Sequence, residues 1–297
     1  MDTERHSPRY SAIDVWEPAD ILDAMIEGHF SAVAAVRAAR PEIEQAALEM
    51  EKRLGKTGRL IYAGAGTSGR LAVQDGAELM PTFNWPQDRL LLLIAGGTEA
   101  LLRPMEGSED QVDRAAALVE EHRIEAADVL VAVAASGTTP FTVTCLREAK
   151  RRGALTVGIA NNRNTPLLRE AEHPIFLDTG AEPIAGSTRM KAGTAQRIAL
   201  LLLSSLIMIR LGRVHAGLMV DVQALNEKLV LRSETMLRQL TDRSGDEVRD
   251  ALSRAKGSVK LAALLLHGCD FAEATAILEQ TGGRLREAIV LADKRHA

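Results

Sequence analysis

The sequence predicts an α/β protein with a five-stranded parallel sheet in a three-layer α/β/α sandwich, N-terminal helices and a C-terminal helical bundle. The first observation behind this prediction is a set of five short runs of mostly Val, Ile, Leu and Ala, at 59–64, 89–97, 128–136, 155–162 and 174–180. These runs do not alternate apolar with polar residues, so we expect strands that are buried on both faces. The second observation is the helical pattern between several of the runs, at 69–80, 109–123 and 139–152. An alternation of strands and helices favours a parallel sheet.

Helical patterns also flank the predicted sheet. Residues 1–20 are polar and expected to be irregular, whereas residues 21–54 are Ala-rich and helical, with Pro41 at the start of a second helix. A long helix is expected between Ser187 and Gly212, and glycines divide the remainder into short helical pieces, about three or four of them beyond residue 240. We therefore expect an N-terminal helical segment, a central sheet domain and a C-terminal helical region, at 1–51, 52–215 and 216–297.

The composition excludes several classes of function. The formal net charge is −4 and aromatic residues make up 3% of the 297 residues, so a nucleic-acid partner is not expected. Cys145 and Cys269 form no CxxC motif and no disulfide framework, which favours a reducing, cytoplasmic compartment. The polar N-terminus predicts no secretory signal. The longest apolar run, the 12 residues from Ile198 to Ile209, is too short to span a membrane.

Two loops of the same kind follow the first and third predicted strands. They read AGAGTSG at 63–69 and AASGTTP at 134–140, and each stands between a buried strand and a helix. Ligands bind at the carboxyl ends of parallel strands, and the N-terminus of the following helix favours an anion. Hydroxyl groups add donors for phosphate oxygens, here those of Thr67, Ser68, Ser136, Thr138 and Thr139. The pair of loops therefore predicts a phosphate site, although Ser136 and Thr139 are also ordinary helix-capping residues.

The glycines of the first loop, Gly64, Gly66 and Gly69, spell the GxGxxG motif of dinucleotide-binding turns. That motif is expected with an acidic residue about 20 positions further on, which holds a ribose. The nearest candidate, Glu99, stands 35 residues after Gly64, and no GKS or GKT follows to make a P-loop. We interpret the three glycines as room for a compact sugar phosphate to approach the backbone.

Two glutamates stand in opposite helical surroundings. We expect Glu78 at the end of a helix that Pro81 stops, where the negative end of the dipole favours the protonated carboxyl. Glu109 falls in the capping-box pattern Ser108-x-x-Gln111, in a first helical turn where the ionised carboxylate is favoured. Carboxyls with opposite preferences are plausible acid and base partners, although each taken alone also fits an ordinary surface role.

Other candidate groups carry a weaker signal. The histidines show no metal-ligand spacing, so we expect no metal site. Arg189 and Lys191 precede the long apolar helix, where they would either neutralise an anionic ligand or lie at the surface. Cys145 stands in the middle of a predicted helix and is interpreted as a small core residue.

Five segments together resemble the N-acetylmuramic acid 6-phosphate etherases, which are proteins of the sugar-isomerase (SIS) fold related to the glucokinase regulatory protein. In chain order they are YAGAGTSGRLAVQDGAELMPTF, IAGGTEALLRPMEGSED, VAVAASGTTPF, EPIAGSTRMKAGTAQR and LMVDVQALNEKL. The resemblance extends from about Leu60 to Leu229 and implies a SIS sugar-phosphate-binding domain at 52–215.

The resemblance implies a carbon–oxygen lyase that removes D-lactate from C3 of N-acetylmuramic acid 6-phosphate and leaves N-acetylglucosamine 6-phosphate. In the open-chain sugar the aldehyde acidifies the C2 proton; a carboxylate removes that proton, lactate leaves, and water adds to the unsaturated aldehyde. The proton-donating glutamate of the family falls on Glu78 and the second glutamate on Glu109. Leu79 and Met80 stand where the family has Cys and Pro.

The resemblance also implies how the substrate is held. The sugar 6-phosphate would be bound by the hydroxyls of both loops, with Ser187 and Lys191 as lesser candidates, and no metal or redox cofactor is needed. A cytoplasmic homodimer without a membrane partner is expected, acting in recycling of cell-wall amino sugars. A non-catalytic sugar-phosphate regulator and a sugar-phosphate isomerase remain alternatives at this point, and an NAD-dependent enzyme is a more distant one.

Overall fold

The computed structural model describes residues 1–222 and 227–296. By their internal contacts the residues form two compact units, which are described separately. The first comprises Met1–Ala77 with Gln87–Ser204, and the second comprises Glu78–Pro86 with Ser205–Ala297. The three-part division expected from the sequence remains a prediction.

The first unit is built on a five-stranded parallel sheet, as predicted. All five apolar runs form strands: β1 Leu60–Gly64, β2 Leu90–Ile94, β3 Val129–Val133, β4 Leu155–Ala160 and β5 His173–Phe176. The strand order is β2-β1-β3-β4-β5. Strands β1 and β3 pair in parallel, with Gly64 at the carboxyl end of β1 opposite Val133 at the carboxyl end of β3. The first and third strands are therefore neighbours, although β2 separates them in the chain.

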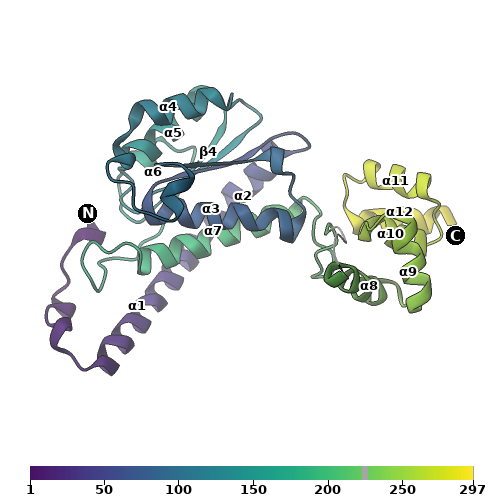
Figure 1. The fold of residues 1–297 in the computed structure, drawn as a ribbon, viewed down its shortest axis with the longest axis horizontal. Coiled ribbons are helices and arrows are strands. Elements are labelled where there is room, and N and C mark those ends of the chain that lie inside the picture. Colours follow the sequence, from purple (N-terminus) through teal and green to yellow (C-terminus); the bar gives the residue numbers. More distant parts are fainter. Residues whose placement is uncertain (223–226, 297) are drawn as a thin grey trace. The chain divides into compact units, whose positions relative to one another are not determined.

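Helices cover both faces of this sheet. Figure 1 shows α4, α5 and α6 on one side and α2, α3 and α7 on the other. The first set spans Val112–Glu121, Pro140–Arg151 and Pro166–Glu170, and the second spans Arg40–Leu54, Gly66–Phe83 and Lys191–Arg210. Ile61, Leu130 and Phe141 belong to the buried cluster between the sheet and the first set. The α/β/α sandwich expected from the sequence is thus confirmed.

The N-terminal segment is anchored near the end of β4. Residues 2–15 contain three short 3-10 turns before α1 begins at Pro18 and runs to Ala38. The Thr3 N–H donates to Asn162 Oδ1 at 3.3 Å, and Asn162 Nδ2 donates to Thr3 Oγ1 at 2.9 Å. Pro41 lies in the first turn of α2, as the sequence predicted.

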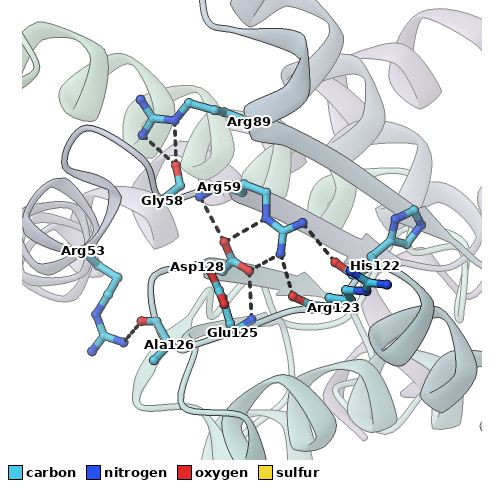
Figure 2. Close-up of polar contacts among 9 residues, drawn as sticks. All are labelled: Arg53, Gly58, Arg59, Arg89, His122, Arg123, Glu125, Ala126 and Asp128. Atoms are coloured by element: carbon cyan, nitrogen blue, oxygen red, sulfur yellow. Dashed lines mark hydrogen bonds and ion pairs between the residues drawn. The ribbon is translucent and has the colours of Figure 1, made fainter.

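Near the amino ends of the strands, three arginines donate hydrogen bonds to backbone carbonyls of neighbouring loops (Figure 2). They are Arg53, Arg59 and Arg89. Arg59, just before β1, donates from Nε to Asp128 Oδ1 at 3.0 Å, and its other nitrogens donate to the carbonyls of His122 and Arg123. This hydrogen bond with buried Asp128 raises the pKa of Arg59. Asp128 also accepts the Glu125 N–H at 3.0 Å. Since Arg59 and Asp128 precede adjacent strands, their ion pair fixes where β1 and β3 begin.

The second unit is helical. It contains α8 Glu227–Thr241, α9 Gly245–Arg254, α10 Val259–Leu266, α11 Phe271–Gln280 and α12 Leu285–His296. Hydroxyl and carboxylate caps start three of these helices: Ser244 in a full capping box, Ser258, and Asp270. Four helices, α9 to α12, therefore begin beyond residue 240 in the described part of the chain, in agreement with the sequence prediction.

Helix α7 is longer than the apolar run that predicted it. Among the described residues it is the one single helix long and apolar enough to cross a membrane, and α10 with α11 pass the same test only as a pair bent by 117°. The apolar run of 12 residues was predicted to be too short to span a membrane, but α7 begins at Lys191 and has 20 residues. Of its most apolar window, 56% is buried inside the protein, which is typical of a helix that packs within a fold.

Removing the Asp128 charge tests the role of this ion pair. We expect Asp128→Asn to lower the free energy of unfolding by about 3 kcal/mol, because it leaves the Arg59 guanidinium without its buried partner. Urea denaturation followed by circular dichroism measures the change. Asp178→Asn is the matched control, since its 2.9 Å pair with Arg163 is solvent-exposed and should cost less than about 1 kcal/mol. Equal effects of the two substitutions would contradict the assignment.

Candidate functional site

The two hydroxyl-rich loops lie next to each other at the carboxyl edge of the sheet. The chain goes from β1 to β2 on one side, and then returns to place β3 on the other side of β1. Such a reversal of strand order is where open parallel sheets bind ligands. The sequence prediction that both loops meet at one edge follows directly from this strand order.

The three glycines of the first loop have different roles. A Cβ on Gly64 would lie 2.8 Å from the Gly69 Cα, so these two glycines allow α3 to pack directly against the end of β1. Gly66 has φ of 53° and no other atom within 4 Å of its Cβ position. Interpreting all three glycines as room for the sugar was therefore wrong for Gly64 and Gly69, and the open space lies at Gly66.

The first turn of α3 presents Thr67 and Ser68. Thr67 is partly buried, and Ser68 is buried. The Gly69 N–H already donates to the Ala65 carbonyl at 3.0 Å, whereas the N–H groups that precede it have no acceptor within the helix. Together with the positive end of the helix dipole, these groups favour an anion.

The second loop is held by its own hydrogen bonds. The Thr138 N–H donates to Ser136 Oγ at 3.2 Å, and the hydroxyls of Ser136 and Thr139 lie 3.3 Å apart. Helix α5 begins at Pro140, and Thr139 makes no side-chain capping bond. The alternative in which Thr139 caps α5 with its side chain is therefore wrong, and its hydroxyl lies next to that of Ser136.

A cavity of about 310 Å³ lies beside the first loop. Its polar lining comes from five side chains, those of Thr67, Arg70, Glu106, Ser108 and Glu109. The rest of the lining is small or apolar. The structure thus brings together the predicted residues Thr67 and Glu109, which stand 42 positions apart in the chain. It also adds Arg70, which the sequence interpretation passed over. Arg70 follows the last glycine and, three residues after Thr67, lies on the same side of α3.

Glu109 lies in a 3-10 turn and not in an α-helix. The turn spans Ser108–Asp110, and α4 begins only at Val112. Ser108 Oγ donates to the Met105 carbonyl at 2.7 Å, so the predicted capping box does not form. Gly107, at φ of 68°, turns the chain just before this segment. The turn keeps Glu109 exposed at the cavity.

Glu78 lies on the same helix as Thr67. Helix α3 continues past Pro81 to Phe83, so the prediction that Pro81 stops it was wrong. The helix ends instead at Asn84, which has φ of 52° and whose N–H donates to the Met80 carbonyl at 2.8 Å. The exposed Glu78 is not among the residues that line the cavity.

A contact with a residue distant in sequence explains why α3 continues beyond Pro81. Arg213 Nη1 donates to the carbonyls of Phe83 and Asn84, both at 2.8 Å. The guanidinium also lies 5.1 Å from the centroid of the Trp85 ring, and its burial lowers the pKa of Arg213. A cation that binds the last carbonyls stabilises a helix end, and nothing in the local sequence around Pro81 indicates it.

The Lys191 side chain is buried and makes a hydrogen bond within the fold. Its buried Nζ donates to the Thr179 carbonyl at 2.9 Å, and burial lowers the pKa of Lys191. The carboxylate of Glu182 accepts the N–H groups of Lys191 and Ala192 at 3.0 and 2.8 Å, and so caps α7. Neither Lys191 nor Ser187, whose N–H donates to the Ile184 carbonyl, lines the cavity beside Thr67. Their part in phosphate binding remains a prediction.

Acidic and histidine side chains do not gather into a metal centre in the part of the chain that the structure describes: no group of three or more His, Cys, Asp or Glu residues is placed to hold an ion. The polar groups of the cavity are hydroxyls, carboxylates and one guanidinium. This set suits hydrogen bonding to a polar ligand and transfer of protons by carboxylates.

Comparison with known proteins gives the class and then the family. Residues 42–150 match the glucokinase regulatory protein N-terminal SIS domain, and residues 109–206 match the SIS domain. The parallel sheet and its paired loops therefore define a SIS-domain protein. Among solved structures, a phosphoheptose isomerase from Francisella tularensis aligns with 65% of this chain and 100% of its own, at 19% identity and a TM-score of 0.49.

Relatives that span nearly the whole chain are more specific. N-acetylmuramic acid 6-phosphate etherase from Deinococcus radiodurans is 46% identical over 97% of this chain and 94% of its own length. The protein of the same name from Streptomyces coelicolor is 43% identical over 98% and 94%. The chain belongs to the N-acetylmuramic acid 6-phosphate etherase family.

Substitution of Gly137 tests whether the second loop forms part of the site. A Cβ at this position, where φ is 68°, would lie 2.3 Å from Thr165 Oγ1. We expect Gly137→Ala to displace the hydroxyl cluster and weaken binding of N-acetylglucosamine 6-phosphate about tenfold or more, measured by calorimetry. Gly180→Ala is the control, because Gly180 has a similar φ of 63° but open space around its Cβ position. Unchanged affinity in folded Gly137→Ala would exclude the loop from the site.

Proposed function

We propose that the protein cleaves the D-lactyl ether of N-acetylmuramic acid 6-phosphate, giving N-acetylglucosamine 6-phosphate and D-lactate. Membership in the etherase family supports this reaction. The single structural observation that carries it is the cavity that joins Thr67, in the anion-favouring first turn of α3, with the carboxylate of Glu109. The reaction needs a phosphate anchor, a base and an acid, and this cavity joins the first two.

The proposed roles follow from the chemistry of the open-chain sugar. The loop hydroxyls and the first N–H groups of α3 hold the 6-phosphate. Glu109 removes the C2 proton that the aldehyde acidifies, the C3–O bond breaks, and the lactate oxygen takes a proton from Glu78. Water then adds its hydroxyl at C3 while a proton returns to C2. Glu109 is exposed at the cavity that Thr67 also lines, so its carboxylate is open to a bound sugar. The assignment of Glu78 rests on the resemblance of its segment to the family.

We place this reaction in the cytoplasm, in the reuse of amino sugars from the cell wall. The proposed substrate is a phosphorylated sugar released from cell-wall material, which supports a catabolic role. Cys145 and Cys269 are both free and buried. Unpaired cysteines are typical of a reducing compartment and support this location.

A homodimer is the assembly that we propose. Helix α1 carries four large apolar side chains that are more than half exposed, namely Leu22, Ile26, Phe30 and Val33. Their spacing of four, four and three residues places them on one face of the helix. Figure 1 shows the first half of α1 extending beyond the sheet and its covering helices. Since a continuous exposed apolar face marks an interaction site, a second copy of the chain is the proposed occupant.

Release of D-lactate tests the proposed function. The wild-type protein should form D-lactate from N-acetylmuramic acid 6-phosphate, followed by a coupled dehydrogenase assay. Glu109→Gln and Glu78→Gln should each lower kcat by about 10²- to 10⁴-fold, because the amide neither takes nor gives the proton, while N-acetylglucosamine 6-phosphate still binds. Asp110→Asn, in the same turn as Glu109, is the control and should stay within about twofold. Absence of lactate with the wild-type protein would end the proposal.

Charge on the apolar face of α1 tests the proposed dimer. Phe30 is 70% exposed in the single chain, so Phe30→Glu should leave the fold intact and shift the protein from dimer to monomer, because burying the new carboxylate is unfavourable. Light scattering coupled to size exclusion measures the mass. Val290→Glu, at a 49% exposed apolar residue of α12, should remain dimeric. A monomeric wild-type protein, or a dimeric Phe30→Glu variant, would contradict this assembly.

A further inference from the structure

Arg70 is a cation of the cavity whose guanidinium makes its hydrogen bonds to backbone carbonyls. Its Nε donates to the Ala100 carbonyl at 2.9 Å, and its Nη2 lies 3.5 Å from the Arg103 carbonyl. Among the described residues no Asp or Glu forms an ion pair with it. The two backbone carbonyls therefore hold the partly buried guanidinium in place and leave its charge available.

The other charged groups of the cavity are acidic. Glu106 and Glu109 both line it, and Arg70 is the cationic residue in its lining. A carboxylate ligand would be repelled by these glutamates unless a cation faced it. Arginine suits this task because its planar fork of N–H donors matches a carboxylate and its charge persists at any physiological pH.

We propose that Arg70 binds the carboxylate of the lactyl group and so makes the site selective for the lactyl ether over its product. This inference rests on the proposed function. The substrate carries two anions, the 6-phosphate and the lactyl carboxylate. The loops offer neutral hydroxyls and N–H groups for the first, which leaves the second for Arg70. N-acetylglucosamine 6-phosphate has the phosphate but no carboxylate.

The position of Arg70 on α3 fits this division. Thr67 and Arg70 are three residues apart and so lie one above the other on the helix, about 4.5 Å apart along its axis. Both line the cavity that Glu109 also lines. Arg70 is a binding residue in this account: by holding the lactyl carboxylate it positions the C2 proton of the sugar toward the base, and it takes no part in the proton transfers.

The test compares two constants in one assay, the KM for N-acetylmuramic acid 6-phosphate and the inhibition constant of N-acetylglucosamine 6-phosphate. Arg70→Ala should raise KM about 10- to 100-fold, because a charge-assisted hydrogen-bonded pair is lost. The inhibition constant of the product should change by less than about threefold. Arg70→Lys, which keeps the charge without the fork, should fall between the wild-type protein and Arg70→Ala.

Controls separate this inference from loss of structure and from failure of the proposed function. Arg103→Ala removes a nearby exposed cation that does not line the cavity, and it should change neither constant. If Arg70→Ala weakened substrate and product equally, Arg70 would serve the phosphate or the loop that it braces, and the inference would fall. Unchanged constants for both would also overturn it. A wild-type protein that releases no lactate would instead refute the proposed function.

Discussion

The candidate site depends on the contact between Gly64 and Gly69. No side chain fits between them, since a Cβ on either glycine would lie 2.8 Å from backbone atoms of the other. Because β1 and α3 meet this closely, the first turn of α3 starts directly at the carboxyl end of a buried strand. The close packing is the same as in a dinucleotide-binding turn. However, Thr67 and Ser68, which stand between the two glycines, carry hydroxyl groups that suit a monophosphate. The glycines thus set the geometry, and the side chains between them set the ligand.

The strand order places two further segments near this contact. Pairing of β1 with β3 brings the second hydroxyl loop alongside the first, and the Arg59–Asp128 ion pair holds the opposite ends of the same two strands (Figure 2). The segment after β2 then returns over the first loop with Glu109, while Arg70 fastens that segment through the Ala100 carbonyl. Arg70 thereby holds the wall of the cavity in place and also supplies a positive charge beside two acidic residues.

Much of this arrangement could be predicted from the sequence, because strands buried on both faces leave continuous apolar runs, and hydroxyl-rich loops leave a readable pattern. The errors arose where distant contacts override a local signal. Pro81 does not end α3, because Arg213 caps the helix two residues beyond it. Ser108 bonds to Met105 and not to the start of α4. For Lys191 only the surface alternative was wrong, because the side chain is buried and its Nζ donates to the Thr179 carbonyl; its part in phosphate binding remains a prediction. Arg70 was missed because a residue just after a glycine motif carries no mark of the cavity that it lines.

The central claim is that a carboxylate removes the C2 proton, that the bond between C3 and the ether oxygen then breaks, and that water adds to the sugar. The most direct measurement is mass spectrometry of both products after turnover of N-acetylmuramic acid 6-phosphate in D₂O and, separately, in H₂¹⁸O. The account predicts one deuterium at C2 of N-acetylglucosamine 6-phosphate and ¹⁸O at its C3 hydroxyl, with no ¹⁸O in the lactate hydroxyl. Incorporation of ¹⁸O into that lactate hydroxyl, or a product without deuterium at C2, would contradict it.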